Sequence, residues 1–354
     1  MASEQRRSVG ATIEAIAAVP VTSNRGAVAA RDHVASEGMK QEHIEAGRTI
    51  QKRTGKTFYL ATRFLPERVR EPTYVLYGFF RIADEVVDDP DGASASEQRM
   101  RLEQLRSQAL GEEATDDPVL TAFVGLRERY DIPERAVDEF VDAMISDVDT
   151  DQYERYESLE RYMGGSAAAV GEMMTAIMEP DDEDAALPHA RRLGEAFQMT
   201  NFLRDVREDV VERDRIYLPA ESLRAHGASV ADVESLEFSE EVGDAIAAEL
   251  RRTETLYREG VAGIRYLPED CQLPVLLAAV LYAEHHRLIR ALEYDVLGET
   301  PSLSTSRKLW CLARTRWHWQ WNRDPESVFR QVSAVPSAEL DRQGTGHDRG
   351  LPVR

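Results

Sequence analysis

The residues best suited to chemistry are three oxygen-bearing side chains in the stretch QMTNFLRDVREDVVERDRIYLP (198–219). Asn201, Asp205 and Asp209 follow one another at steps of four residues. This spacing places them on one face of a helix, each roughly 6 Å above the last. Hard oxygen ligands at this interval suit Mg2+, which also takes water and phosphate oxygens. Arg204 lies beside them and suits a phosphate that arrives with the metal. We call Asn201, Asp205 and Asp209 the acidic ladder.

A second acidic pair, Asp84 and Asp88, also lies four residues apart, inside the stretch ADEVVDD (83–89). Such pairs arise by chance in a chain with 64 acidic residues among 354, and a solvated helix face is their ordinary explanation. This acidic pair, however, closes a run of bulky apolar residues (74–82), which favours an inward position. Arg81, one turn before Asp84, could meet a phosphate on the same side.

A charged surface face is also the ordinary explanation for the acidic ladder. Phe202 and Val206 leave that helix without a clean polar side, however, and asparagine is unfavourable in mid-helix unless its side chain has a partner. If the ladder faced the acidic pair, two or three Mg2+ ions between them could bind a diphosphate and stabilise its departure. The allylic carbocation left behind requires a dry, apolar and partly aromatic cavity.

The rest of the sequence predicts helices that position these side chains. From His43 to about residue 300, apolar residues recur at helical intervals, and alternating strand patterns and Asn-Gly hairpin signals are absent. We therefore expect one all-α domain of about eight to ten helices. Start and stop residues predict a helix that opens near Pro72 and closes before Pro90, one from Ser239 to Tyr266, and one from Pro274 to Leu297.

Three segments are expected along the chain. Residues 1–38 form an N-terminal extension that we expect to be poorly ordered. Residues 39–300 form the catalytic domain, and residues 301–354 form a Trp/Arg-rich segment with a polar tail. Beyond Ser327 we expect a disordered end.

All four tryptophans lie in the locally basic stretch RKLWCLARTRWHWQWNR (307–323): Trp310, Trp317, Trp319 and Trp321. Two interpretations stay open. The stretch either packs on the core or lies peripherally at the inner surface of a membrane, where tryptophan and arginine favour the interface.

Composition limits the classes of function. The net charge is -21, and only four of the 43 basic residues are lysine, which indicates a protein of a salt-rich cytoplasm. No basic footprint is available for nucleic acid. The two cysteines, Cys271 and Cys311, belong to no CxxC motif, so neither a disulfide framework nor a zinc site is expected. The sequence contains no run of 18 apolar residues and no signal peptide, and a cytoplasmic location is expected.

Both acidic motifs resemble those of the squalene/phytoene synthase family. The second motif, Asn-x-x-Arg-Asp-x-x-Glu-Asp followed by Arg-Ile-Tyr-Leu-Pro (201–219), is long and specific. The similarity extends to TFYLATRFLP (57–66), VLYGFFRIADEVVD (75–88) and LLAAVLYAEHHRLI (276–289), and covers about residues 45 to 300. One departure follows Tyr162, where the family commonly has a Val-Ala-Gly core and this chain has Ser-Ala-Ala (166–168).

The resemblance implies a single-domain isoprenoid synthase (class I terpenoid synthase) helical bundle with a central cavity. It assigns catalysis to Tyr77, Tyr162, Asp84, Asp88, Asp205 and Asp209. It assigns metal binding to Asp84 and Asp88 on one wall and to Asn201, Asp205 and Asp209 on the other, with assistance from Glu85 and Glu208. It assigns contacts with diphosphate or substrate to Thr57, Phe58, Arg81, Gln198, Arg204, Arg215 and Tyr282.

The resemblance is strongest to the phytoene-forming branch. It implies the head-to-head condensation of two geranylgeranyl diphosphates through prephytoene diphosphate to phytoene, a step of carotenoid biosynthesis. Mg2+ is the expected cofactor, Mn2+ could replace it, and NADPH is not expected. One alternative is a squalene synthase-type enzyme that uses farnesyl diphosphate and NADPH. The other is a non-catalytic helical partner protein of the same fold, against which the intact acidic motifs argue.

Overall fold

The computed structural model describes residues 62–88 and 92–337 of the 354-residue chain. Thr57, Phe58, the extension 1–38 and most of the segment that leads from His43 into the first described helix lie outside these residues.

The described residues form an all-α fold, as predicted. Their only β-type pairing is an isolated bridge between Gln152 and Ile216. In chain order the elements are α5 (Glu67–Asp88), α6 (Ala95–Leu110), α7 (Pro118–Arg129), α8 (Glu134–Asp147), α9 (Tyr156–Met163), the π-helix η1 (Gly164–Ala168), α10 (Ala169–Met178), α11 (Glu183–Arg204), α12 (Val206–Arg213), α13 (Ala220–Ala225), α14 (Val230–Glu234), α15 (Glu240–Ala262), the 3-10 helix η2 (Gly263–Tyr266), α16 (Glu269–Ala291), α17 (Thr305–Trp321) and α18 (Pro325–Val332).

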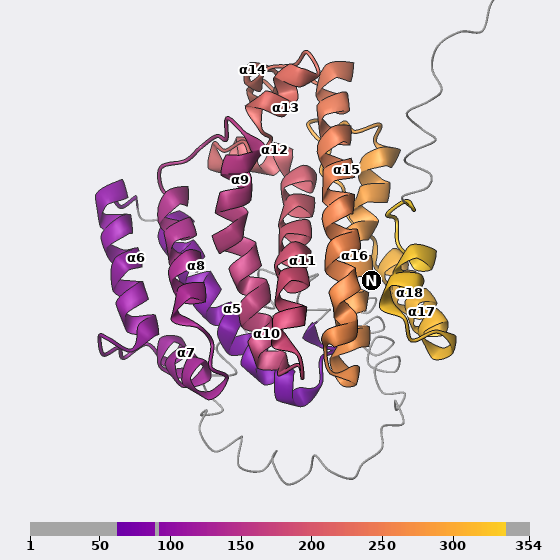
Figure 1. Ribbon diagram of the computed structural model, residues 1–354. Helices are drawn as coiled ribbons and strands as arrows, with labels where there is room; N and C mark the ends of the chain where they lie inside the picture. Colours follow the sequence, from indigo (N-terminus) through magenta and orange to yellow (C-terminus); the bar gives the residue numbers. More distant parts are fainter. Residues whose placement is uncertain (1–61, 89–91, 338–354) are drawn as a thin grey trace, which may run out of the picture.

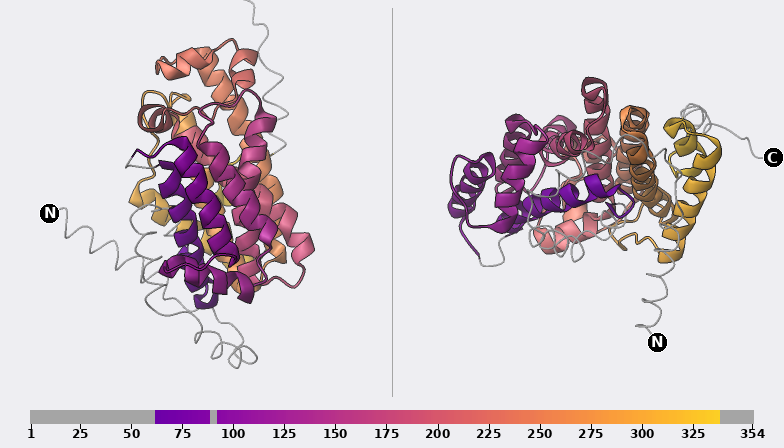
Figure 2. Two further views of the ribbon diagram at one scale, coloured as in Figure 1. Left: turned by 90° about the vertical axis from the view of Figure 1, so that its left-hand side faces the viewer. Right: turned by 90° about the horizontal axis from the view of Figure 1, so that it is seen from below.

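Helix α11 stands at the centre of the bundle (Figure 1). It packs against α10 and η1 on one side and against α15 and α16 on the other. Helix α5 crosses behind α8 and α10 and contacts both. Seen from below, α17 and α18 lie at the margin opposite α6 and α7 (Figure 2). The two helices that carry the acidic motifs, α5 and α11, are thus set on either side of the bundle interior.

Pro72 lies inside α5 and not near its first turn, so the predicted start is wrong. A proline at this position cannot donate to the carbonyl of Arg68, four residues earlier. The hydroxyl of Tyr130 donates to that carbonyl instead, at 3.5 Å. A tyrosine from the end of α7 therefore donates to the carbonyl that Pro72 leaves without its usual helical donor.

The other predicted boundaries had mixed outcomes. Ser239 caps α15 as predicted, and η2 carries the run to Tyr266. Helix α16 begins at Glu269 and ends at Ala291, so the predicted limits at Pro274 and Leu297 are both wrong. Glu269 and Asp270 are acidic residues that stabilise a helix amino end, which allows α16 to begin before its proline.

The tryptophan-rich stretch forms α17, and its four tryptophans divide between core and surface. Trp319 is buried, whereas Trp310, Trp317 and Trp321 are 42%, 62% and 78% exposed. The buried carboxylate of Glu284 in α16 accepts a hydrogen bond from Nε of Arg307 at 2.7 Å, which joins α17 to α16. The expectation of a disordered end beyond Ser327 is wrong up to residue 335, because the apolar side chains of α18 and the turn after it are buried: Val328, Phe329, Val332 and Val335.

Gly165 in the π-helix allows η1 to approach α8 closely. A β-carbon at Gly165 would lie 2.1 Å from the carbonyl oxygen of Glu139, whereas one at Gly164 would meet nothing within 4 Å. We expect Gly165→Ala to lower the free energy of unfolding by about 1–3 kcal/mol through overpacking. Gly164→Ala, the matched control, should leave it unchanged or raise it by a few tenths, because helical alanine is favoured over glycine. Urea unfolding of both variants measures the difference, and equal midpoints would contradict the contact.

No helix in the described part of the chain is long and apolar enough to cross a membrane.

Candidate active site

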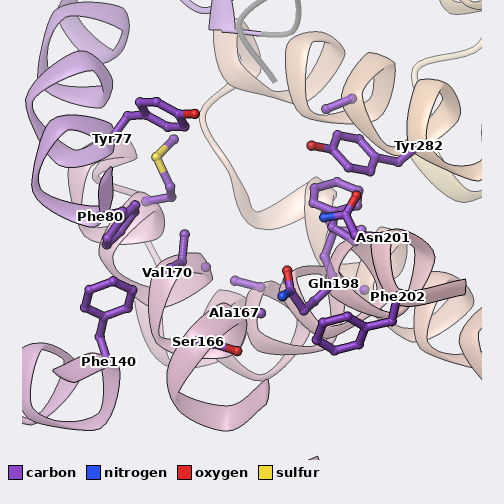
Figure 3. Close-up of a pocket in the computed structure, with 18 of the residues that line it drawn as sticks. Tyr77, Phe80, Phe140, Ser166, Ala167, Val170, Gln198, Asn201, Phe202 and Tyr282 are labelled. Atoms are coloured by element: carbon purple, nitrogen blue, oxygen red, sulfur yellow. The ribbon is translucent and has the colours of Figure 1, made fainter. Parts of the chain in front are cut away.

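A cavity of about 570 Å³ runs through the bundle between α5 and α11. In Figure 3, Tyr77 and Phe80 of α5 face Asn201 and Tyr282 across it. The acid-bearing ends of α5 and α11 lie at one end of the cavity, and its far part is lined mainly by apolar residues of α10, α11, η2 and α16. The described residues therefore combine a charged end and an apolar interior in a single space.

The acidic pair and the acidic ladder both line this cavity. Glu85 and Glu208 do not line it, and Glu208 instead lies 3.5 Å from Arg213. The structure thus brings five of the seven predicted metal ligands to one space. The cavity lining also includes seven residues predicted for catalysis or for diphosphate and substrate contact: Tyr77, Arg81, Tyr162, Gln198, Arg204, Arg215 and Tyr282.

The acidic ladder does not lie on one continuous helix, so this part of the prediction is wrong. Helix α11 ends at Arg204, and Asp205 adopts φ -102° and ψ 14° before α12 begins. The backbone N–H of Asp205 still donates to the carbonyl of Asn201 at 2.8 Å, and that of Asp209 to the carbonyl of Asp205 at 2.8 Å. The three residues of the acidic ladder therefore keep their four-residue helical spacing across the kink at Asp205.

Arginines pair with the carboxylates of both walls. Arg81 lies 3.7 Å from Asp84 and 3.8 Å from Asp88, and Arg204 donates from Nε to Asp205 at 2.7 Å. Arg213 donates to Asp209 at 2.7 Å. These arginines are placed to exchange a carboxylate partner for a phosphate oxygen.

The carboxylates of the two walls are crowded and poorly solvated. Burial raises the pKa of Asp84 to about 7, although Arg81 lowers it. The Asp84 side chain is 47% exposed, but the space to which it is exposed is the cavity inside the bundle. Burial also raises the pKa of Asp209 to about 7, against the effect of Arg213. Negative charge here is only partly compensated by the protein.

This donor set fits a hard divalent cation. Four carboxylates and the amide oxygen of Asn201 are the ligand types that Mg2+ takes together with waters and phosphate oxygens. No three His, Cys, Asp or Glu side chains in the described ranges come close enough to hold an ion by themselves. The fit is therefore that of an ion held between two walls with a bound diphosphate, and not that of a closed protein cage.

Aromatic rings form the cavity wall next to the acidic end. Phe202 stacks on Tyr217 with ring centroids 3.9 Å apart, and Tyr162 lies 6.1 Å from Tyr217 and 6.3 Å from Phe202. On the opposite side Tyr282 stacks on Phe197 at 4.5 Å. Such faces attract a cation.

Three residues of this site were missed from the sequence. Asp147, at the end of α8, lines the cavity and accepts a hydrogen bond from Arg215 at 2.9 Å. Arg213 and Tyr217 also line it. Both stand inside the stretch 198–219 and could have been suspected from that position. Asp147 belongs to no spaced motif, and only the fold brings it here.

Comparison with known proteins agrees with this arrangement. The sequence profile described as squalene/phytoene synthase matches residues 51–308. The chain belongs to the squalene/phytoene synthase family.

Three curated relatives are named as phytoene synthases. The phytoene synthase of Rhodobacter capsulatus is 31% identical over 273 residues, which cover 74% of this chain and 78% of the relative. The phytoene synthase of Thermus thermophilus is 33% identical and covers 70% of this chain and 83% of the relative. The 15-cis-phytoene synthase of Synechococcus elongatus is 30% identical, with 76% and 90% covered.

Solved structures of similar proteins have the same fold. A dehydrosqualene synthase in complex with a ligand superimposes with a TM-score of 0.72 and 27% identity, over 80% of this chain and 98% of that one. A squalene synthase from Alicyclobacillus acidocaldarius gives a TM-score of 0.64 at 24% identity, with 72% and 95% covered. The isoprenoid synthase bundle expected from the motifs is confirmed.

In this squalene/phytoene synthase family member, a buried polar network joins α11 to α15 and α16. The hydroxyl of Thr200 lies 2.9 Å from that of Tyr257 and 3.0 Å from Nε2 of His286. Nδ1 of His286 lies 3.3 Å from Glu254, which also pairs with Arg290. Thr200 immediately precedes Asn201, so the network fixes the segment that presents the ladder.

We expect His286 to make the stability of the fold depend on pH. Burial, the largest effect, lowers the pKa of His286, although Glu254 raises it. The unfolded chain therefore binds a proton at this histidine more readily than the folded chain does. The contribution of neutral His286 to the free energy of unfolding is complete above the unfolded pKa of about 6.5. It is lost as pH falls below that value, by at most about 1.4 kcal/mol per pH unit. Urea unfolding at pH 7.5 and 5.5 should show a smaller loss for His286→Gln than for the native chain. Equal losses would contradict a neutral buried His286.

Proposed function

We propose that the chain is a phytoene synthase, which condenses two geranylgeranyl diphosphates to phytoene through prephytoene diphosphate, with release of two diphosphates. The observation that carries this proposal is the single cavity with two acidic walls at one end and an apolar interior beyond them. The names of the relatives described above favour phytoene as the product, and such a reaction is a step of carotenoid biosynthesis.

We assign metal binding to Asp84 and Asp88 on one wall and to Asn201, Asp205 and Asp209 on the other. Bound Mg2+, or Mn2+ in its place, would neutralise the diphosphate and make it a better leaving group. Arg81, Arg204 and Arg213 would bind phosphate oxygens that the metal leaves free, whereas Arg215 donates both of its Nη groups to Asp147. The rings of Tyr162, Phe202 and Tyr217 would face the carbocation and keep water away from it.

The length of the cavity suits a C20 chain. The lining residues of α11 extend from Arg204 to Ala186, and 18 residues at 1.5 Å each span about 27 Å. An extended chain advances about 1.2 Å per bond, as an extended peptide does, so a geranylgeranyl chain measures about 19 Å and a farnesyl chain about 14 Å. The apolar part beyond the acidic end thus has room for the longer substrate.

Incubation with geranylgeranyl diphosphate and Mg2+, with and without NADPH, tests the proposal through the mass of the hydrocarbon product. We expect phytoene in both reactions. A product that needs NADPH and is two hydrogens heavier would instead assign the chain to the squalene synthase type, with farnesyl diphosphate as the parallel substrate. Absence of turnover with either substrate would favour the non-catalytic partner.

We also propose that α17 contacts the inner surface of a membrane. Trp317 and Trp321 are exposed and contact each other edge to face, with centroids 6.2 Å apart. Arg307 and Arg314 both lie over the ring of Trp310. Vesicle flotation should recover the native chain and lose the Trp317→Ser/Trp321→Ser variant. Met100→Ser, which removes an exposed apolar side chain from α6, is the control, and equal flotation of all three proteins would refute the contact.

A further inference from the structure

Asp147 presents an unsatisfied oxygen at the cavity. The residue is only 6% exposed. Its Oδ2 accepts a hydrogen bond from Nη1 of Arg215 at 2.9 Å, and its main-chain carbonyl accepts one from Nη2 of the same arginine at 2.8 Å. Its Oδ1 is buried and accepts no hydrogen bond of ordinary geometry, although the hydroxyl of Tyr162 lies close enough to Asp147 to lower the pKa of its carboxyl. A buried acceptor without a hydrogen bond is destabilising and uncommon in folded proteins, so a functional role would explain why this oxygen is retained.

The surroundings of Asp147 are those of a cation site. The rings of Tyr153, Tyr162 and Tyr217 lie with centroids 5.6–6.1 Å apart. Burial raises the pKa of all three phenols, and the charge of Asp147 is the second cause for each. Burial raises the pKa of Asp147 itself to about 6, against the lowering effects of Arg215 and Tyr162. The carboxylate is therefore mostly ionised at neutral pH and lines the same cavity as Tyr162 and Tyr217, whose rings would face a carbocation.

Other groups at the cavity are less suited to accept a proton. Burial raises the pKa values of Tyr162 and Tyr217, so both phenols stay neutral and weakly basic. The carboxylates of the acidic pair and the acidic ladder are assigned to metal and pair with arginines. His285 and His286 do not line the cavity. The charged groups that act on Asp147 are Arg215, Asp88, Arg213 and Asp84, and of these only Arg215 donates a hydrogen bond to it.

We propose that Oδ1 of Asp147 accepts the proton lost by the last carbocation of the reaction, and that Arg215 holds the carboxylate in place. The C–H bond next to the cationic carbon breaks, and its electron pair forms the new C=C bond. The proton moves to Oδ1 and returns to water when the product leaves. This inference rests on the proposed function, because a product that keeps its proton would need no such base.

The test compares Asp147→Asn with the native chain on geranylgeranyl diphosphate, by the masses of all C40 products. Removal of a general base typically costs 10²–10⁴-fold, so we expect phytoene to fall by about that factor. Prephytoene diphosphate, or C40 alcohols formed by capture of water, should rise relative to phytoene. Asp142→Asn, an exposed position on the same helix that pairs with Arg106, is the matched control and should leave the product ratio unchanged.

A proportional loss of all products, or an unchanged yield of phytoene, would overturn the role of Asp147. The double variant Asp147→Asn/Arg215→Gln removes the arginine's unpaired charge and supplies a folded protein if the single variant does not fold. It is scored by the same product ratio. Absence of any C40 product from the native chain would count against the proposed function itself, so the two failures are distinguishable.

Discussion

Asp205→Asn is expected to lower turnover of geranylgeranyl diphosphate by on the order of 10³-fold, about 4 kcal/mol of transition-state stabilisation. Asp205 stands at the kink between α11 and α12 and is the middle residue of the acidic ladder. Asparagine keeps the size of the side chain and one oxygen, but it removes the negative charge that a bridging metal would require. It also leaves Arg204 without its carboxylate partner.

Steady-state rates across a range of Mg2+ concentrations measure this effect, with thermal unfolding as a check on the fold. Higher Mg2+ should recover only part of the lost rate. Asp214→Asn is a suitable control because it removes a nearby exposed carboxylate that does not line the cavity. Asparagine also tolerates the left-handed conformation of that residue, φ 54°. A native rate for Asp205→Asn would exclude Asp205 as a metal ligand.

Ala278→Phe is expected to change which chain length the cavity accepts. Tyr282 of α16 stacks on Phe197 of α11, and Phe197 lies eight residues before Asp205. Ala278, one turn before Tyr282 on α16, lines the cavity further from its acidic end. These positions place Ala278 about 18 Å from Asp205, near the end of a C20 chain and beyond that of a C15 chain. A phenyl ring here should reduce turnover of geranylgeranyl diphosphate by on the order of 100-fold.

Competition between the two substrates provides the measurement. The variant should process farnesyl diphosphate at a rate within about tenfold of the native chain, since the shorter substrate ends before the new ring. That reaction is also the control for folding and for the metal site. Equal losses with both substrates would mean that Ala278 affects the cavity as a whole and does not limit its length.

Local sequence patterns predicted that the acidic pair and the acidic ladder each group on one face, because four-residue spacing on helices is a local property. The same holds for Ser239, whose side chain caps α15 by accepting a hydrogen bond from the backbone N–H of Val242. Contacts between distant segments could not be predicted in this way. Pro72 is tolerated within α5 through a tyrosine 58 residues later, and Asp147 reaches Arg215 across 68 residues. Neither contact leaves a periodic trace in the sequence.

The ends of the chain show the same limit. Polar composition beyond Ser327 concealed four buried apolar side chains, because a short amphipathic helix such as α18 contains few apolar residues even when all of them are buried. The kink at Asp205 could not be predicted either, because no proline or glycine lies near it in the sequence. Helical spacing correctly brought the three ladder residues together, although the helix that carries them is broken.

The π-helix η1 affects how positions in this chain are matched to those of its relatives. Residues 164–168 contain one residue more than an α-helical turn, so α10 is turned by about 100° from where an uninterrupted helix would place it. In this orientation Val170 and Met174 of α10 line the cavity. A relative that lacks the extra residue presents different side chains at the same alignment columns. Cavity residues of α10 should therefore be transferred between relatives by superposition and not by counting from Tyr162.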